Sequence, residues 1–220
     1  IYECEAIYSI RDSIDCSDTT LKDRIYNELV EIDKFDITTS VSEYEKNIIN
    51  DLFNIKTTLL QFSLRESSVN IKFEEREHIL FVGSLENKES PNYHGLMIFI
   101  ENCMDDLVGH FNENIELHIV SGVTHPEIRK ELNKLHQSSV KFLGCVKEVR
   151  DIYSRYKIFI APTFSAAGLS QKVCEAAINR IPVVTTEVIA SQLNWVNYKH
   201  CLYSNNIKDI SKYCIYLYPD

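Results

Sequence analysis

From about residue 78 onward, apolar residues follow two alternating patterns. Continuous apolar runs rich in β-branched residues alternate with longer segments in which apolar residues recur every three or four positions. The runs are typical of strands buried on both faces, and the segments between them are typical of helices that cover those faces. We therefore predict an α/β domain with a doubly wound parallel sheet. Its strands are expected at residues 79–83, 116–120, 140–143, 158–161 and 183–185.

The first 70 residues show a shorter alternation of the same kind, which predicts a partial second α/β unit. Ser42 followed by Glu45 forms a capping-box pattern, in which two side chains satisfy backbone N–H groups at the start of a helix. The expected elements are a strand, a helix, a strand and a helix, at residues 1–9, 19–35, 36–42 and 42–53.

A polar, charge-rich segment at residues 63–78 has no period and separates these two regions. We therefore predict two units, residues 1–70 and residues 78–220. The first unit is expected to contact the second weakly, through a cleft on the carboxyl side of the second unit's strands.

The composition argues against several classes of partner. Of 220 residues, 45% are hydrophobic and 25% are charged, and the net charge is −9. An acidic surface repels phosphate, which argues against nucleic acid and against simple electrostatic docking to anionic lipid. Seven cysteines, without a C-x-x-C pair, fit reduced cytoplasmic thiols better than a disulfide framework or a zinc site.

No apolar run approaches the roughly 20 residues that a membrane span needs. The start of the chain, at Ile1, lacks the basic and then apolar pattern of a signal peptide. We expect a cytoplasmic location, and a longer protein of which this chain is a fragment.

Three glycine-containing loops follow predicted strands. In open α/β sheets, ligands bind where the carboxyl ends of the strands lead into helices. Gly83 and Gly122 each come directly after a strand, and the third loop is APTFSAAGLSQK, residues 161–172. Small residues in the third loop let the backbone approach a ligand, and the free N–H groups of the next helix would face an anion.

Lys172 and Glu175 lie three residues apart on the helix after this loop, so they share one face. A cation near phosphate and a carboxylate that accepts both hydrogen bonds of a vicinal diol would suit a nucleotide diphosphate. The alternative is a solvated surface pair that contributes a few tenths of a kcal/mol. From the residues alone, the surface pair is the more common case.

Several segments between residues 79 and 186 share a family pattern, and the last of them is the most specific. They are ILFVGSL, PNYHGLMIFI, IELHIVSG, VKFLGCVKEVRDIYSRYKIFIAPT and AAGLSQKVCEAAINRIPVVTT. In this order and spacing they resemble the Rossmann-like donor-binding domain of GT-B glycosyltransferases, in the retaining group often called family 4. ECEAIYSIRD and FDITTSVSEYEKNII, in the first 70 residues, resemble the end of the N-terminal, acceptor-side domain of such enzymes.

The resemblance implies a role for each matching residue. Glu175 would bind the ribose hydroxyls of the donor, and Lys172 would lie by the diphosphate. Gly83 and Ser84 would approach the phosphates from the other side, and Val146 would lie by the base. The loop residues expected to contact the donor are Ser165, Ala166, Ala167, Gly168 and Leu169. Truncation of Glu175 should weaken nucleotide binding and change the stability of the fold little.

Three departures from the family pattern concern phosphate binding. The first of two usual glutamates is Ala167 here, a usual arginine is Ser84, and a usual lysine is His94. We therefore expect Lys172 to carry more of the phosphate charge. The same losses leave open a degenerate copy without activity.

The sequence thus predicts a retaining glycosyltransferase, or its donor-binding part. It would move a sugar from a nucleotide-diphosphate sugar to a glycan or lipid-linked acceptor in surface polysaccharide synthesis. Two alternatives stay open: a non-catalytic subunit of this fold that binds a partner, and a nucleotide-sugar epimerase. No catalytic residue is assigned, no cluster of Asp, Glu and His for a metal is apparent, and the resemblance implies no cofactor and no essential metal. Membrane association would be peripheral and through regions beyond this chain.

Overall fold

The computed structural model describes residues 35–60, 63–67, 69, 71–112, 114–122, 125–135, 139–166 and 168–219. The strand and helix expected near the start of the chain lie outside the described residues.

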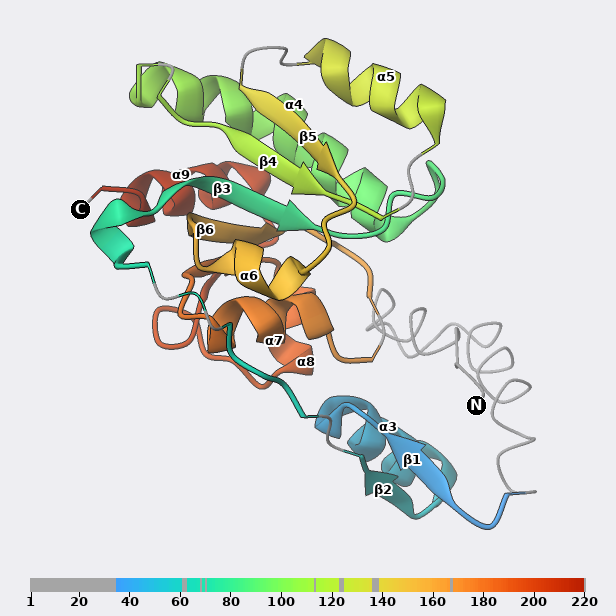
Figure 1. The fold of residues 1–220 in the computed structure, drawn as a ribbon. Helices are drawn as coiled ribbons and strands as arrows, with labels where there is room; N and C mark the ends of the chain where they lie inside the picture. The colour runs from blue at the N-terminus through green and yellow to red at the C-terminus, as the bar shows by residue number, and fades with distance from the viewer. Residues whose placement is uncertain are drawn as a thin grey trace.

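A six-stranded sheet forms the centre of the larger part of the chain (Figure 1). Its strands are β3 (Glu77–Val82), β4 (Leu117–Val120), β5 (Val140–Gly144), β6 (Tyr156–Ala161), β7 (Val183–Thr185) and β8 (Leu202–Tyr203). They lie in the order β5-β4-β3-β6-β7-β8, and every neighbouring pair is parallel. The predicted fold class and its five predicted strands are confirmed. The pattern does not predict β8, because two residues are too few to show a period.

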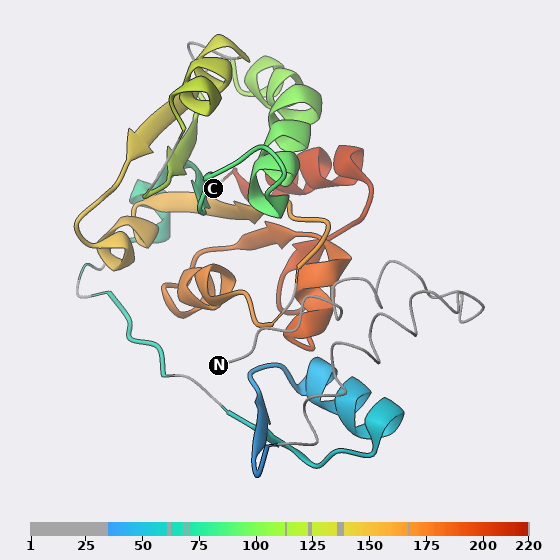
Figure 2. The ribbon, with the colours of Figure 1, turned by 90° about the vertical axis from the view of Figure 1, so that its right-hand side faces the viewer.

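Helices cover both faces of this sheet (Figures 1 and 2). On one face lie α4 (Pro91–His110), α5 (Pro126–Leu135) and α9 (Ile207–Leu217), and on the other α6 (Val149–Tyr153), α7 (Gln171–Ile178) and α8 (Glu187–Gln192). Alternate residues of β3 show the division, because Ile79 and Phe81 pack in the core with α4 while Leu80 packs in the core with α7. A doubly covered sheet of this kind explains the continuous apolar runs.

A smaller unit precedes the sheet. β1 (Thr38–Ser40) and β2 (Thr57–Leu59) pair in parallel, and α3 (Glu43–Phe53) connects them. These two strands form a sheet separate from the six-stranded one. The short helix η2 (Phe73–Glu75) leads into β3.

Ser42 caps α3, as the sequence predicts. Its hydroxyl accepts a hydrogen bond from the Glu45 N–H at 3.5 Å. The other half of the predicted capping box does not form, because the Ser42 N–H donates to Ser40 Oγ at 3.1 Å and the Glu45 carboxylate accepts from Gly168. The acid expected to cap its own helix therefore contacts the larger unit.

Further contacts join the smaller unit and the connecting segment to the larger unit. α3 packs on α8, where Ser42 Oγ donates to the Gln192 carbonyl oxygen at 3.5 Å. Ser67 donates from its N–H to Asn179 Oδ1 at 2.9 Å and from its hydroxyl to Asp151 Oδ1 at 3.0 Å. Part of the aperiodic segment is thus held against α6 and the end of α7. The division of the chain into residues 1–70 and 78–220 stays a prediction.

α4 begins at Pro91, after a cap in which Ser90 Oγ accepts from the Tyr93 N–H at 3.2 Å. Proline fits the first helical position, where its missing N–H is not needed. Asn92 therefore lies in the first helical turn, next to the end of β3.

Gly95 lets α4 pack directly on the chain after β6. A Cβ atom at this position would lie 2.0 Å from the Pro162 carbonyl oxygen and 3.1 Å from Thr163 Cα. Both neighbours are backbone atoms, which can move only if the loop after β6 moves with them. The contact therefore fixes the start of α4 against that loop.

We expect Gly95→Ala to lower the free energy of unfolding by about 2 kcal/mol or more, because overpacking against backbone outweighs the better helix propensity of alanine. Gly109→Ala, in the last turn of the same helix, is the matched control, since its Cβ would meet nothing within 4 Å. The control should be neutral or stabilising by up to about 1 kcal/mol. Urea unfolding measures both variants, and equal effects would contradict the close approach.

Candidate functional site

A pocket of about 570 Å³ lies at the carboxyl edge of the sheet, the edge at which open α/β sheets bind ligands. The end of β3, the start of α4, the loop after β6, the start of α7 and α8 enclose it. The lining residues are Val82, Gly83, Ser84, Pro91, Asn92, Val149, Thr163, Ser165, Ala166, Ser170, Gln171, Lys172, Glu175, Ile189 and Gln192.

Lys172 is the only cation among the described residues that line this pocket. Its ammonium donates to Asn92 Oδ1 and lies 5.2 Å from the centroid of the Phe81 ring. Burial lowers the pKa of Lys172 to about 8. The ammonium thus has a neutral amide and an aromatic ring as neighbours, and its positive charge remains available to an anion.

Glu175 lines the same pocket and is half-buried. Its Oε2 accepts a hydrogen bond from the Tyr153 hydroxyl at 3.1 Å, and its Oε1 accepts from Gln171 Nε2 at 2.9 Å. Burial and the Glu175 carboxylate raise the pKa of Tyr153. Both partners of Glu175 are neutral, and Lys172 donates to Asn92. The interpretation as a solvated surface pair therefore does not describe this helix.

Two elements hold the loop between β6 and α7. Gly168 has a φ of +66°, in the left-handed region that glycine adopts without strain. Its N–H donates to the Glu45 carboxylate of α3. Gln192 of α8 donates from Nε2 to the Ala166 carbonyl oxygen at 2.9 Å.

Two buried polar atoms of the lining residues lack a hydrogen-bond partner. They are Thr163 Oγ1 and Gln192 Oε1, and their residues are 4% and 2% exposed. A buried polar atom without a partner costs about 1–3 kcal/mol. A ligand that supplied hydrogen bonds to these atoms would recover that free energy.

Six residues of the predicted donor site line the pocket: Gly83, Ser84, Ser165, Ala166, Lys172 and Glu175. Val146, Gly168 and Leu169 are not among the lining residues. Val146 packs against the core beside α6 and α7, and Val149 lines the pocket in its place. Ala167 lies outside the described residues.

Three further positions from the sequence analysis, Gly122, His94 and Ser84, place no positively charged side chain in the pocket. Gly122 is exposed and is not among the described residues that line it, and the next two residues of its loop lie outside the described residues. His94 is exposed and also does not line it. Ser84 is uncharged and donates to Glu86 Oε1 at 2.9 Å. The charge of the pocket therefore depends on Lys172, as the departures from the family pattern imply.

Sequence patterns do not identify the residues that hold the Lys172 ammonium and the loop before α7 in place, or the residue that donates to the Glu175 carboxylate. Asn92 is 80 positions from Lys172 in the chain, and the Pro91 helix start was the available signal for its position. Tyr153 lies at the end of α6, a helix of five residues, and nothing in the sequence indicates its contact with Glu175. Gln192 lies on α8, a helix of six residues that is too short to show a clear period.

A family model described as glycosyl transferases group 1 matches residues 76–220, more than half of the chain. The chain belongs to this family. The match confirms the resemblance to GT-B glycosyltransferases found in the sequence. No curated protein sequence matches the chain.

Solved structures of glycosyltransferases share the fold. A mutant of TarM from S. aureus, in complex with fondaparinux, alpha-GlcNAc-glycerol and UDP, has a TM-score of 0.72 at 15% identity, over 94% of this chain and 42% of that one. The pneumococcal O-GlcNAc transferase GtfA, in complex with UDP and GlcNAc, has a TM-score of 0.65 at 16% identity, over 86% and 38%. WaaG, a glycosyltransferase involved in lipopolysaccharide biosynthesis, has a TM-score of 0.56 at 14% identity, over 80% and 51%. The chain thus spans about half or less of each of these proteins.

Among the described residues, no helix combines the length and the apolar character required to cross a membrane.

We expect Glu175→Ala to lower the free energy of unfolding by about 1–3 kcal/mol, because the buried Tyr153 hydroxyl loses its acceptor. This prediction differs from the sequence-based expectation that Glu175 contributes little to stability. Glu175→Gln keeps an acceptor and should cost less than about 1 kcal/mol. Urea unfolding compares the two, and Tyr153→Phe in the Glu175→Ala background should recover part of the loss. No recovery would show that the hydroxyl is not the cause.

Proposed function

We propose that this chain is the donor-binding part of a glycosyltransferase that uses a nucleotide-diphosphate sugar. The diphosphate would lie at the start of α7 beside Lys172, and the ribose hydroxyls would lie against Glu175. The sugar would pass to a glycan or lipid-linked acceptor.

The observation that carries this proposal is the environment of the Lys172 ammonium. It lies in the pocket with neutral Asn92 as its hydrogen-bond partner, and burial lowers its pKa to about 8. Burial disfavours the charged form, and an anion in the pocket reverses this effect. The side chain of Ser170, which precedes α7, accepts no hydrogen bond from the first helical turn. The N–H groups of that turn and the ammonium together favour a doubly charged anion such as a diphosphate.

Glu175 supports a ribose next to the diphosphate. Each of its oxygens accepts one hydrogen bond within the protein, and an ionised carboxylate has about four acceptor positions in all. Two acceptor positions therefore remain for a vicinal diol. The uncompensated Thr163 Oγ1 and Gln192 Oε1 offer further polar contacts in the same pocket.

We further propose that transfer retains the anomeric configuration and serves the synthesis of a surface glycan. Retention rests on the sequence resemblance alone. The glycan role is supported by the fold shared with WaaG, which takes part in lipopolysaccharide biosynthesis. The proposal needs no metal at the diphosphate, because Lys172 and the N–H groups of α7 supply the positive charge that stabilises a leaving diphosphate.

We expect Lys172→Met to weaken UDP binding by at least about tenfold, because a hydrogen bond to a charged group contributes about 1.5–3 kcal/mol. The pKa of Lys172 also predicts a pH effect. Above about pH 8 the free protein has lost the ammonium proton and must take one up to bind, so affinity should fall between about pH 7.5 and 9.5. The phosphate groups of UDP are almost fully ionised in this range. Lys172→Met should lack this decline in isothermal titration.

Inorganic pyrophosphate separates the phosphate contacts from the ribose contacts in the same titrations. Lys172→Met should weaken both ligands, whereas Glu175→Gln should weaken UDP and leave pyrophosphate unchanged. Lys130→Met, which removes an exposed lysine of α5, controls for net charge. UDP affinities that are equal in wild type and Lys172→Met would overturn the proposed site.

Glu45 occupies the Gly168 N–H, one of the backbone groups that the family resemblance assigns to phosphate. A carboxylate a few ångströms from a phosphate is repelled by about 1–4 kcal/mol at intermediate dielectric. We therefore expect Glu45→Gln to raise UDP affinity by about fivefold or more. Glu43→Gln, an exposed acid of the same helix, should leave the affinity unchanged. Lower affinity in Glu45→Gln would show that the acid supports the bound state.

A further inference from the structure

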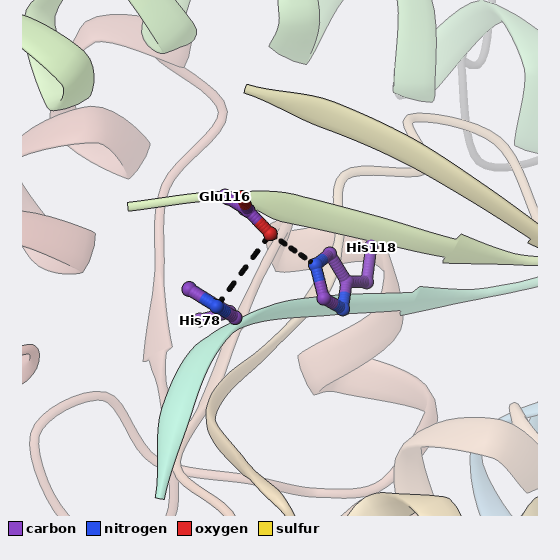
Figure 3. Close-up of side chains that lie close together, drawn as sticks. All are labelled: His78, Glu116 and His118. Carbon is purple, nitrogen blue, oxygen red and sulfur yellow. Dashed lines mark hydrogen bonds and ion pairs between the residues drawn. The ribbon is translucent and has the colours of Figure 1, made fainter. Parts of the chain in front are cut away.

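Three metal-ligand side chains meet at the amino ends of β3 and β4, at the opposite edge of the sheet from the pocket. They are His78, Glu116 and His118 (Figure 3), and their ligand atoms lie within 4.8 Å of one another. The Oε2 atom of Glu116 is 2.6 Å from His118 Nε2 and 3.5 Å from His78 Nε2. One carboxylate oxygen thus lies close to two imidazole nitrogens.

The strand register brings these residues together. Ile79 lies opposite Leu117 in the parallel pair of β3 and β4, so His78 and Glu116 meet one residue earlier. Glu116 directly precedes β4 and His118 lies two residues later in it, so their side chains share a face of the sheet. The sequence does not reveal this cluster, because His78 and Glu116 are 38 positions apart in the chain.

Neighbouring side chains hold His118 and Glu116 in place. His118 Nδ1 lies 2.8 Å from the Tyr156 hydroxyl, so the ring can donate from Nδ1 and turn the lone pair of Nε2 toward Glu116. The other carboxylate oxygen of Glu116 is held by Lys141 Nζ at 2.6 Å, which leaves Oε2 for an ion. The side chains of His78, Glu116 and His118 are 24%, 19% and 14% exposed. This exposure leaves room for water as a fourth ligand.

We propose that His78, Glu116 and His118 bind a zinc-class divalent transition ion, with water as the fourth ligand. Two imidazoles and a carboxylate are a known zinc ligand set, and tetrahedral bonds of 2.0–2.2 Å place ligand atoms about 3.4 Å apart. The 3.5 Å separation already matches this spacing, and the 2.6 Å contact must widen by roughly 1 Å. Imidazole nitrogen favours zinc, copper and nickel over magnesium and calcium, which prefer oxygen ligands.

Binding requires a proton shift within His118 and no net change in its protonation. Without an ion, the proton on Nε2 can point at Glu116 and the Tyr156 hydroxyl can donate to Nδ1. With an ion, the proton moves through water to Nδ1, the Tyr156 hydroxyl oxygen accepts a hydrogen bond from Nδ1–H, and Nε2 becomes a ligand. Lys141 competes with the ion for the charge of Glu116, because its ammonium contacts the same carboxylate.

The site is distinct from the donor pocket and does not depend on the proposed function. His78 is at the start of β3 and Gly83 follows its end, a distance of about 16 Å along a strand. An ion there would cross-link β3 and β4 through side chains and stabilise the sheet.

The test is zinc titration of the metal-free 220-residue chain by calorimetry, with cobalt as a spectroscopic substitute for zinc. One equivalent of zinc should bind, cobalt should give the visible bands of a tetrahedral site, and magnesium should not bind. His78→Asn is the main variant, because it removes the imidazole and because asparagine tolerates the φ of +61° at this position. Glu116→Gln is the second variant, and both should weaken zinc binding by more than tenfold. His110→Asn removes an exposed histidine outside the cluster and should bind zinc as wild type does.

Lys141→Gln should bind zinc several times more tightly, since it removes the competing cation. Melting curves without metal show whether each variant folds, and zinc should raise the melting temperature of wild type but not of His78→Asn. Several outcomes overturn the proposal. They are no binding by wild type, zinc binding that persists in His78→Asn and Glu116→Gln, and an affinity of Lys141→Gln no higher than that of wild type. Zinc binding that persists in both variants would assign the ion to other groups, such as the exposed Cys145. The three side chains would then form a hydrogen-bonded network only.

Discussion

A parallel sheet must bury both of its faces, and the rest of this structure depends on that constraint. All six residues of β6 are buried, so the chain has to return over one face or the other after each strand. Every return starts at the carboxyl edge, and loops and helix starts therefore collect there. The strand order places β3 between β4 and β6. The chain after β3 turns to one face and the chain after β6 to the other, which opens the pocket between these neighbouring strands.

The ammonium of Lys172 places a positive charge in that pocket, although the chain as a whole is acidic. The protein carries a net charge of −9, yet an ammonium lies in the pocket with an amide as its partner. An aspartate in place of Asn92 would hold the lysine as well, but it would neutralise the charge that attracts an anion. The burial that lowers the pKa of Lys172 also lowers the local dielectric, so it strengthens the attraction once an anion is present. Glu45 adds the opposite effect from the smaller unit, since its carboxylate occupies a backbone N–H of the same loop.

The sequence predicts what depends on period and on short-range chemistry. It locates β3 to β7 and the helix of Lys172 and Glu175, because each shows a clear apolar run or helical period next to a glycine or proline signal. It does not locate β8 or α8, which are too short to show a period. It also misses Asn92, Tyr153 and Gln192, because their importance comes from contacts made only after the sheet has formed. The half-formed capping box of α3 has the same origin, since a contact with Gly168 replaces a local one.

The histidine cluster shows how much a strand register adds to a sequence pattern. A histidine inside the apolar run of β4, two residues after Glu116, was visible in the sequence as a polar position on an otherwise buried strand. Only the pairing of β3 with β4 reveals that His78 completes the group. β3 carries a ligand of this group at one end and the glycine of the pocket at the other, with Ile79, Leu80 and Phe81 fully buried between them. A segment packed on both faces resists displacement along its length. An ion at the amino end would therefore stabilise the sheet on which the pocket is built. Its effect on the pocket would come from the stability of β3 and not from contact with a ligand.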